Sequence, residues 1–482
     1  MLPTIATGNV ASATAGGYEV DNSCRFNDDD DARIGLDFSG AGNLDTWTMS
    51  AWVKRCNLGA NSSIFTCNGL GALAQKGTIR FDSTDKISCY VLFAGSAWHS
   101  ITSSAVYRDT SAWYHIVVRC DTTQSTDTDR LRLYVNGTLQ ALSASAYPDQ
   151  NEDTFFNEAE EHQIGSLIDE TEDGDMYLAE FCWIDGTSYG PTSFGEFDDD
   201  SPTIWKPIDV SGLTFGTNGG YFEFKDSSDL GVNTKGNDWT PTNLAATDQA
   251  TDTPTNSFCT MNPLTGSAVV YSEGNCVASF SAISGHWRSG ALATMGVAAG
   301  KWYWEAKIIT GSTLNITGVI RDTDAGFASG VVTGNLYTRN VNFFAGDGWI
   351  YKQDDADVEV DTIFGVWADD DIFSIALDMD NKKMWAARNG DWGVDNADGD
   401  PAAGSGEQID SSNFTDGAFY IPCNSGNKAY TPSPVLAMNF GGCPGFAISS
   451  GNADGNGYGN FEYAPPSGFL ALCTKNLGSD GG

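Results

Sequence analysis

The sequence predicts an all-β protein made of two tandem antiparallel β-sandwich (jelly-roll) domains. The chain has 482 residues, more than a single hydrophobic core usually serves. Apolar and polar residues alternate in many short segments, as they do in strands with one buried face. The chain also holds 55 glycines and few long runs of helix-forming residues, which favours short strands joined by tight turns.

Alternation predicts the strands of the first half. The segments with this pattern are residues 47–54, 114–120, 131–135 and 176–184. In the last segment, every second residue from Tyr177 to Trp183 is expected to share one face. Asn136-Gly137 follows the third segment and predicts a hairpin, because both residues of a type I′ turn need a positive φ.

The second half repeats the pattern. Residues 301–308 and 373–379 alternate, and a turn at Asp380-Asn381 returns the chain through 382–385 toward Asn389-Gly390. This order predicts a hairpin that belongs to a second sandwich.

The predicted domain organisation has five parts. They are an N-terminal segment (1–20), a first sandwich (21–224), an extended connector (225–279), a second sandwich (280–475) and a flexible tail (476–482). The connector is expected because the alternation gives way there to Ser, Asn, Thr, Asp and Pro. Trp239 and Phe258 are expected to attach it to a neighbouring domain.

Charge and cysteine content argue against several classes of protein. With 25 basic and 63 acidic residues the net charge is −38, so the surface repels nucleic acid instead of binding its phosphates. The 11 cysteines form no C-x-x-C pair, which disfavours a zinc site or a disulfide framework and favours buried thiols in a chain made in a cytoplasm. Neither a secretory signal nor an apolar run long enough for membrane insertion is visible.

Several segments, in order, resemble the laminin-G-like, concanavalin A-like jelly roll. They are Ser50–Arg55, Trp113–Val118 and Leu133–Gly137, with Gly174–Phe181 similar to the closing strand of that fold. The resemblance covers residues 20–210. It implies a lectin-type sandwich, and relatives of this type often bind Ca²⁺.

The second half resembles the SPRY domain over residues 280–475. The similar segments are Gly300–Glu305, Phe373–Asn381 and Ala387–Gly390. Ala386-Ala387 departs from that family, which usually carries a larger side chain there, so the local packing is expected to differ. Domains of this family normally bind proteins.

Other segments are similar to stretches of structural proteins of marine bacteriophages. They are Val20–Asp30, Gly236–Pro241, Pro254–Phe258 and Tyr463–Cys473. This resemblance implies a virion protein of the tail-fibre or receptor-binding kind, made in the host cytoplasm and carried on the surface of the phage particle. It also implies other virion proteins and host-surface glycans as partners. A homo-oligomer is expected, since such appendages are often trimers.

Two groups of residues have the composition of a sugar-binding site, in which an aromatic platform lies beside hydrogen-bonding groups. The predicted ligand-binding residues are Trp98, His99, Tyr107 and Asp109 in the first sandwich, and Trp349 and Tyr351 in the second. The alternative is that these rings belong to the cores, to which alternation assigns Trp183, Trp302 and Trp304.

An acidic loop precedes the last predicted strand of the first sandwich. Asp169, Asp173 and Asp175 offer the carboxylate oxygens that Ca²⁺ prefers, so a calcium site is predicted there, with a merely solvated loop as the alternative. No cofactor is expected to be required. Residues 452–457 resemble the start of an EF-hand loop, but Asn452 and Tyr463 replace its first and last ligands, so a turn is predicted.

Asp357, Glu359 and Asp361 alternate with two valines. On a strand they would place three carboxylates on one face, as in some glycoside hydrolases. A charged edge strand that prevents sheet-to-sheet association is the favoured interpretation. No catalytic residue and no enzymatic activity are therefore predicted.

The leading hypothesis is a non-enzymatic bacteriophage virion protein, a tail fibre or receptor-binding component, that adheres to host-surface glycans. The alternative is a capsid decoration, head-fibre or tail-assembly subunit that makes only protein–protein contacts. A glycan depolymerase is a third hypothesis. The residue pattern specifies neither the glycan nor the host nor the symmetry.

Overall fold

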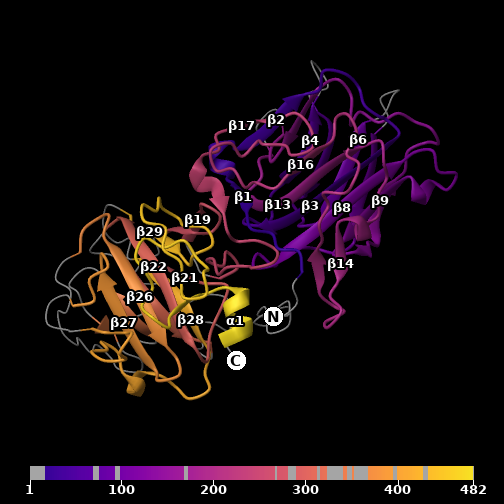
Figure 1. Ribbon diagram of the computed structural model, residues 1–482. Helices are drawn as coiled ribbons and strands as arrows, with labels where there is room; N and C mark the ends of the chain where they lie inside the picture. The colour runs from indigo at the N-terminus through magenta and orange to yellow at the C-terminus, as the bar shows by residue number, and fades with distance from the viewer. Residues whose placement is uncertain are drawn as a thin grey trace. The chain divides into compact units, whose positions relative to one another are not determined.

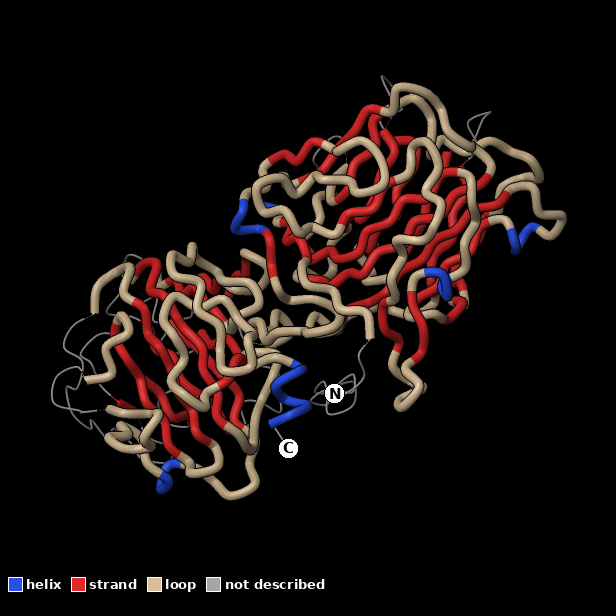
Figure 2. Tube along the Cα trace, in the orientation of Figure 1, coloured by secondary structure: helices blue, strands red, loops and turns tan. Residues whose placement is uncertain are grey.

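The computed structural model describes residues 17–68, 75–92, 98–167, 172–265, 269–280, 289–311, 315–322, 340–344, 350–351, 367–393, 399–426 and 433–480. Strands make up nearly all of the regular structure (red in Figure 2). The chain divides into two compact units, Thr14–Thr255 and Asn256–Gly482, called here the N-terminal and C-terminal units. The predicted all-β class with antiparallel sheets is confirmed. Within the described ranges, no helix is long and apolar enough to cross a membrane.

The N-terminal unit contains two eight-stranded antiparallel sheets. Sheet A runs β10 (Thr138–Leu139), β9 (Leu131–Val135), β8 (Trp113–Asp121), β3 (Thr46–Arg55), β13 (Met176–Asp185), β1 (Ser23–Phe26) and β18 (Gln249–Ala250), with β16 (Gly220–Phe222) also on β13 (Figure 1). Sheet B runs β11 (Leu142–Ala146), β7 (Trp98–Ser103), β6 (Ile87–Leu92), β5 (Gln75–Phe81), β4 (Ser62–Asn68), β12 (Glu161–Ile164), β2 (Arg33–Asp37) and β17 (Thr240–Thr242).

The core of the N-terminal unit is filled by every second residue of the strands. These side chains include Trp47, Met49, Ala51 and Val53 of β3, Ile116, Val118 and Cys120 of β8, and Ile79, Cys89 and Ile101 of sheet B. The predicted alternation is confirmed for these strands. Asn136 (φ 47°) and Gly137 (φ 75°) form the β9–β10 turn, as the Asn-Gly pair predicts. All 11 cysteines of the chain are buried.

A β-bulge at Glu180 changes which residues of β13 face the core. The register with β3 shifts between Ala179 and Cys182, where Glu180 adopts a φ of 49° and an extra residue enters the strand. The core-facing residues of β13 are Met176 and Leu178 before the bulge and Phe181 and Trp183 after it. The prediction that every second residue from Tyr177 to Trp183 shares one face is therefore wrong, because the extra residue inverts the alternation.

The Glu180 carboxylate lies in a buried hydrogen-bonded cluster. Its Oε2 atom accepts from the hydroxyls of Tyr221 (2.6 Å) and Tyr18 (3.1 Å), and these hydroxyls lie 2.9 Å from each other. Burial raises the pKa of Glu180 to about 7, although the two tyrosine hydrogen bonds oppose this shift. The protonation of this cluster therefore changes near neutral pH.

Part of the segment 186–255 covers the outer face of sheet A, whereas Phe222 and Trp239 of the same segment lie in the main core. The apolar cluster on that face consists of Val117, Cys182, Ile184, Phe194, Val210, Phe215 and Tyr221. Two buried ion pairs hold the end of the covering segment. Lys54 Nζ lies 2.6 Å from Asp252 Oδ2, whose other oxygen accepts from Trp113 Nε1 at 3.0 Å. Arg25 Nη2 lies 2.9 Å from Asp248 Oδ1.

The extended connector expected over residues 225–279 is divided between the two units. Residues up to Thr255 belong to the N-terminal unit, where Trp239 is part of the main core. Residues from Asn256 onward belong to the C-terminal unit, where Phe258 is buried. The polar side chains of this stretch form hydrogen bonds to the main chain and ion pairs with buried charged side chains. The stretch is therefore not a free linker.

The C-terminal unit also contains two sheets. The larger one runs β19 (Val269–Ser272), β20 (Val277–Phe280), β29 (Val435–Asn439), β22 (Lys301–Thr310), β26 (Ile372–Asp378) and β27 (Lys383–Arg388), with β30 (Leu470–Ala471) parallel to β22. The other runs β21 (Ser289–Leu292), β28 (Tyr420–Gly426), β23 (Asn315–Arg321), β24 (Asn340–Phe344) and β25 (Ile350–Tyr351). The β26–β27 hairpin is the one predicted, and both Ala386 and Ala387 are fully buried in it.

Two features of the C-terminal unit attach its last residues to the sheet. The buried Glu305 carboxylate accepts from the N–H groups of Glu462 (3.0 Å) and Tyr463 (2.8 Å) and from Asn439 Nδ2 (3.0 Å). The chain then ends in helix α1 (Thr474–Asp480), whose Asn476 side chain is fully buried. The flexible tail predicted from residue 476 is thus corrected up to residue 480, since this segment is helical and packed.

Replacing Asp252 with alanine is expected to lower the free energy of unfolding of the N-terminal unit by about 3–5 kcal/mol, because Lys54 would remain buried without its counter-charge. Urea unfolding followed by tryptophan fluorescence measures the change. Asp226→Ala, which removes an exposed carboxylate of the same unit, is the control. An Asp252→Ala variant as stable as this control would contradict the role given to the ion pair.

The Glu180 cluster predicts that stability falls as pH rises. The pKa is about 7 in the folded state against an ordinary value of 4.5, so the unfolded chain releases this proton first. Between these two values, this group should lower the free energy of unfolding by up to ~3 kcal/mol. Thermal unfolding near pH 5 and near pH 8 should show a smaller loss of stability for Glu180→Gln than for the wild type. Equal losses in the two proteins would argue against the assignment.

Candidate binding site at one rim of the N-terminal unit

Five connections meet at one end of the two sheets and are called here the rim. They are residues 27–32 (β1–β2), 56–61 (β3–β4), 82–86 (β5–β6), 104–112 (β7–β8) and 165–175 (β12–β13), the last without 168–171, which lie outside the described residues. Antiparallel pairing brings every second connection to the same end of a sheet. The rim is therefore assembled from segments far apart in the sequence.

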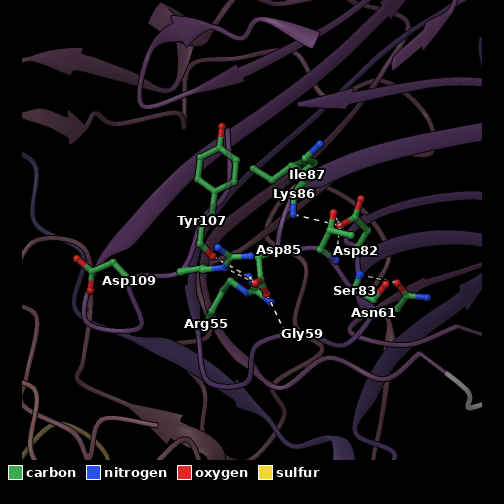
Figure 3. Close-up of polar contacts among 12 residues, drawn as sticks. Arg55, Gly59, Asn61, Asp82, Ser83, Asp85, Lys86, Ile87, Tyr107 and Asp109 are labelled. Atoms are coloured by element: carbon green, nitrogen blue, oxygen red, sulfur yellow. Dashed lines mark hydrogen bonds and ion pairs between the residues drawn. The ribbon is translucent and has the colours of Figure 1, made fainter. Parts of the chain in front are cut away.

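Asp85 joins three of these connections (Figure 3). Its Oδ1 atom accepts from the Gly59 N–H (2.7 Å) and from Arg55 Nη1 (3.2 Å), and its Oδ2 atom accepts from Arg108 Nε (2.6 Å). Its main-chain carbonyl accepts from the Tyr107 N–H at 2.8 Å. Asp85 makes these contacts from a left-handed conformation (φ 65°), which aspartate adopts more readily than most residues.

Burial and charge act in opposite directions on this network. Burial alone would raise the pKa of Asp85, but the hydrogen bonds from Arg108, Gly59 and Arg55 hold it below its ordinary value. Burial lowers the pKa of Arg55, and the charge of Asp85 opposes that shift. Arg55 remains a cation, because arginine is not deprotonated in proteins. Two guanidinium groups therefore share one carboxylate, and the network carries an excess positive charge.

A second network joins the β12–β13 connection to the same rim. Glu172 pairs with Arg80 and accepts from Asn61 Nδ2 at 2.8 Å. Asn61 Oδ1 in turn accepts from the Ser83 N–H at 2.9 Å, and the Ser63 N–H donates to the Glu172 carbonyl at 3.1 Å. The described loops of the rim are thus held to one another by side chains and do not depend on packing alone.

Two of the predicted sugar-binding residues lie in the β7–β8 connection of the rim, with different exposures. Tyr107 is only 7% exposed; its ring contacts Tyr114 edge-on and its hydroxyl donates to Gln140 at 2.9 Å. The expectation of a ligand-stacking platform at Tyr107 is therefore corrected, because the ring belongs to the core. Asp109 is exposed, and its Oδ1 atom accepts from the N–H and hydroxyl of Ser111.

The remaining predicted sugar-binding residues do not join the rim. His99 lies near the start of β7, at the other end of the sheet, with its Nε2 atom 3.4 Å from Glu152 Oε2. Trp98 begins that strand, and its side chain lies outside the described part of the chain. In the C-terminal unit, Trp349 lies outside the described residues, and of Tyr351 only the main chain, in β25, is described.

The predicted calcium ligands fall on the β12–β13 connection. Asp173 and Asp175 are both buried; Asp173 Oδ1 accepts from Ser166 Oγ at 2.5 Å, and the Asp175 carbonyl accepts from the Cys56 N–H at 3.0 Å. Asp169 lies outside the described residues. Among the residues that are described, no group of three or more His, Cys, Asp or Glu side chains is placed to hold a metal ion. Calcium binding stays a prediction.

Two other candidates from the sequence are the EF-hand-like segment 452–457 and the acidic residues near position 359. In the segment 452–457, Asp454 Oδ1 accepts from the N–H groups of Asn456 and Tyr458, both at 2.9 Å, as a turn requires. The carboxylates of Asp357, Glu359 and Asp361 lie outside the described residues.

The Ser50–His115 pair resembles a nucleophile beside a base, but its protons are placed for another role. His115 Nδ1 accepts from Trp205 Nε1 (2.9 Å), so the ring proton lies on Nε2 and is donated to Ser50 Oγ (2.9 Å). Complete burial lowers the pKa of His115 to about 3, which keeps it neutral. A histidine that donates to the serine cannot accept its proton, so this pair supports the sheet and is no catalytic dyad.

The sequence interpretation missed Arg55, Asp85 and Arg108, which hold the rim together. One signal was available for Arg55: it occupies the next core-facing position after Trp47, Met49, Ala51 and Val53. A charged residue at a core-facing position needs a buried counter-charge. Nothing in the local sequence identifies Asp85 as that partner, since the two residues are brought together by sheet pairing.

Asp85→Asn is expected to loosen the rim, because asparagine keeps the left-handed backbone accessible but removes the charge that balances Arg55 and Arg108. Hydrogen exchange at the amides of Gly59 and Tyr107 should become about tenfold faster or more. Asp82→Asn in the same turn is the control, since its bonds to the Thr84 and Lys86 N–H groups need no charge. Unchanged exchange in Asp85→Asn would contradict the role given to Asp85.

A family profile, that of the concanavalin A-like lectin/glucanases superfamily, matches residues 28–173, a range that contains the 56–61, 82–86 and 104–112 connections. This match supports a concanavalin A-like domain in the first half of the chain. The search of curated proteins gave no match.

The solved structures that are similar to parts of the chain include the following three. The SPRY domain of human HERC1 has 15% identity and a TM-score of 0.27, over 37% of this chain and 96% of that chain. A heptameric SAP-like pentraxin from Limulus polyphemus has 13% identity and a TM-score of 0.27, over 36% and 80%. A Bacteroides ovatus protein provisionally described as carbohydrate-binding has 15% identity and a TM-score of 0.31, over 47% and 61%.

Proposed function

We propose that the N-terminal unit binds glycans through the rim, without catalytic turnover, and that the chain is an adhesive surface component of a bacteriophage particle. The observation that carries the binding site is the adjacent pair Arg108 and Asp109. Both are exposed, and both lie on a connection whose backbone Asp85 fixes. The lectin-type profile over the same residues supports the substrate class.

The pair offers complementary hydrogen-bonding groups to a sugar. The Arg108 side chain is 55% exposed and donates its Nε–H to Asp85, and its two terminal NH2 groups make no hydrogen bond to the described residues. Asp109 uses Oδ1 for Ser111, and its Oδ2 atom accepts no hydrogen bond from the described residues. A cation beside a carboxylate can bind neighbouring hydroxyls of one sugar ring, one as donor and one as acceptor.

Apolar contact is available next to this pair. Val106, on the same connection, is 44% exposed, and Leu139 is 52% exposed beside Gln140, which accepts from the Tyr107 hydroxyl. Sites for small ligands combine apolar surface with a few placed polar groups. Tyr107 then supports the site, because its hydrogen bond to Gln140 links the β7–β8 connection to the segment that carries Leu139.

The placement on a phage particle is supported by the segments that resemble marine bacteriophage structural proteins, and by a net charge of −38, which keeps a surface protein soluble. In this proposal the partners are host-surface glycans and other virion proteins.

The binding site is tested on a glycan array and by titration calorimetry with host polysaccharide or lipopolysaccharide. Arg108→Ala and Asp109→Ala should each weaken binding by about tenfold or more, because each removes a charged hydrogen-bonding group. Asp121→Ala is the matched control: Asp121 accepts from Thr123 as Asp109 accepts from Ser111, but lies at the other end of β8. Wild-type protein that binds neither purified glycan nor whole host cells would overturn the proposal.

A further inference from the structure

Residues 136–147 form one lateral edge of the N-terminal unit, on both sheets at once. Within them, β10 is the last strand of sheet A and β11 is the last strand of sheet B. Residues 140–141 connect the two strands. β11 pairs with β7 on one side, and on its other side it meets no main-chain partner among the described residues.

This edge has no charged residue, although the chain as a whole carries a net charge of −38. From Asn136 to Tyr147 the sequence reads Asn-Gly-Thr-Leu-Gln-Ala-Leu-Ser-Ala-Ser-Ala-Tyr. Leu139 and every residue from Ser143 to Ala146 are exposed. Within the described ranges, the edge therefore combines main-chain groups that have no partner on the outer side of β11 with small side chains that let another backbone approach closely.

Natural proteins usually protect such edges with charge, proline or a bulge. The opposite edge of the same sheet, β17, has Pro241 at its centre and is only three residues long. β11 has a bulge between Leu142 and Ala144, but the pairing of Ala144, Ser145 and Ala146 with β7 is regular. These last three residues are the unprotected part.

We infer that this edge is the interface with a second copy of the chain, formed by antiparallel pairing of β11 with the β11 strand of the other copy. A two-fold axis at Ser145 places Ser145 opposite its own counterpart and Ala144 opposite Ala146, so only small uncharged side chains meet. Such a contact is self-complementary, as a two-fold interface requires.

The distribution of charge favours a second copy of the chain as the partner at this edge. Two chains of −38 repel each other over most of their surfaces, and an uncharged edge lets them approach with the least repulsion. Cations flank the contact at both ends: Lys86 Nζ lies 3.2 Å from Ser143 Oγ, and Arg130 Nη1 donates to the Pro148 carbonyl at 2.8 Å.

Sedimentation velocity on the full chain, over a range of concentrations and in low and high NaCl, tests this interface. The wild type should form a dimer whose dissociation constant falls as salt screens the remaining repulsion. Ser145→Lys places two like charges directly opposite each other and should raise the dissociation constant by about tenfold or more. Thr240→Lys, exposed on β17 of the same sheet, should leave it unchanged.

A mixture distinguishes a broken interface from a damaged fold. Ser145→Lys and Ser145→Glu should each be monomeric alone and should form a heterodimer together, because the opposed charges then attract. A wild type that stays monomeric in every condition would overturn the inference, as would a dimer that Ser145→Lys leaves intact. A trimer would overturn it too, since a two-fold contact closes at two copies. The pairing tested here involves Ala144, Ser145 and Ala146, none of which is among the residues proposed to bind glycan, so its failure leaves the glycan proposal standing.

Discussion

Buried carboxylates that attach loops to sheets are the interaction on which the rest of this structure depends. Asp252 does so through Lys54 and Trp113 in the N-terminal unit, and Glu305 does so through main-chain N–H groups in the C-terminal unit. A buried carboxylate is costly unless it is paired or fully hydrogen-bonded. The chain has 63 acidic and only 25 basic residues. Its buried carboxylates therefore need both the few Lys and Arg side chains and many main-chain N–H groups as partners.

The rim follows the same rule. Asp85 accepts hydrogen bonds from both Arg55 and Arg108, and so fixes the connection that carries Asp109. Rigid sheets with side-chain bonds between their loops allow polar groups to keep a set geometry without a ligand.

The net negative charge also distinguishes the lateral edge at β11, which has no charged residue, from the rest of the surface. Elsewhere the net charge keeps copies apart, as it does for many soluble proteins. An edge strand of alanine and serine lacks that protection, and its unpaired main-chain groups are satisfied either by water or by another strand. Charge and sheet topology are therefore the two observations that support the dimer interface inferred at this edge.

The sequence by itself determined the all-β class, the principal strands and the β9–β10 turn, because alternation and the Asn-Gly pair act over neighbouring residues. It could not locate the bulge at Glu180, the division of the connector at Thr255 or the burial of Tyr107. Nor could it pair Arg55 and Arg108 with Asp85. Those features depend on which strands become neighbours, and only the tertiary structure decides that, since local patterns carry no information about contacts between distant segments.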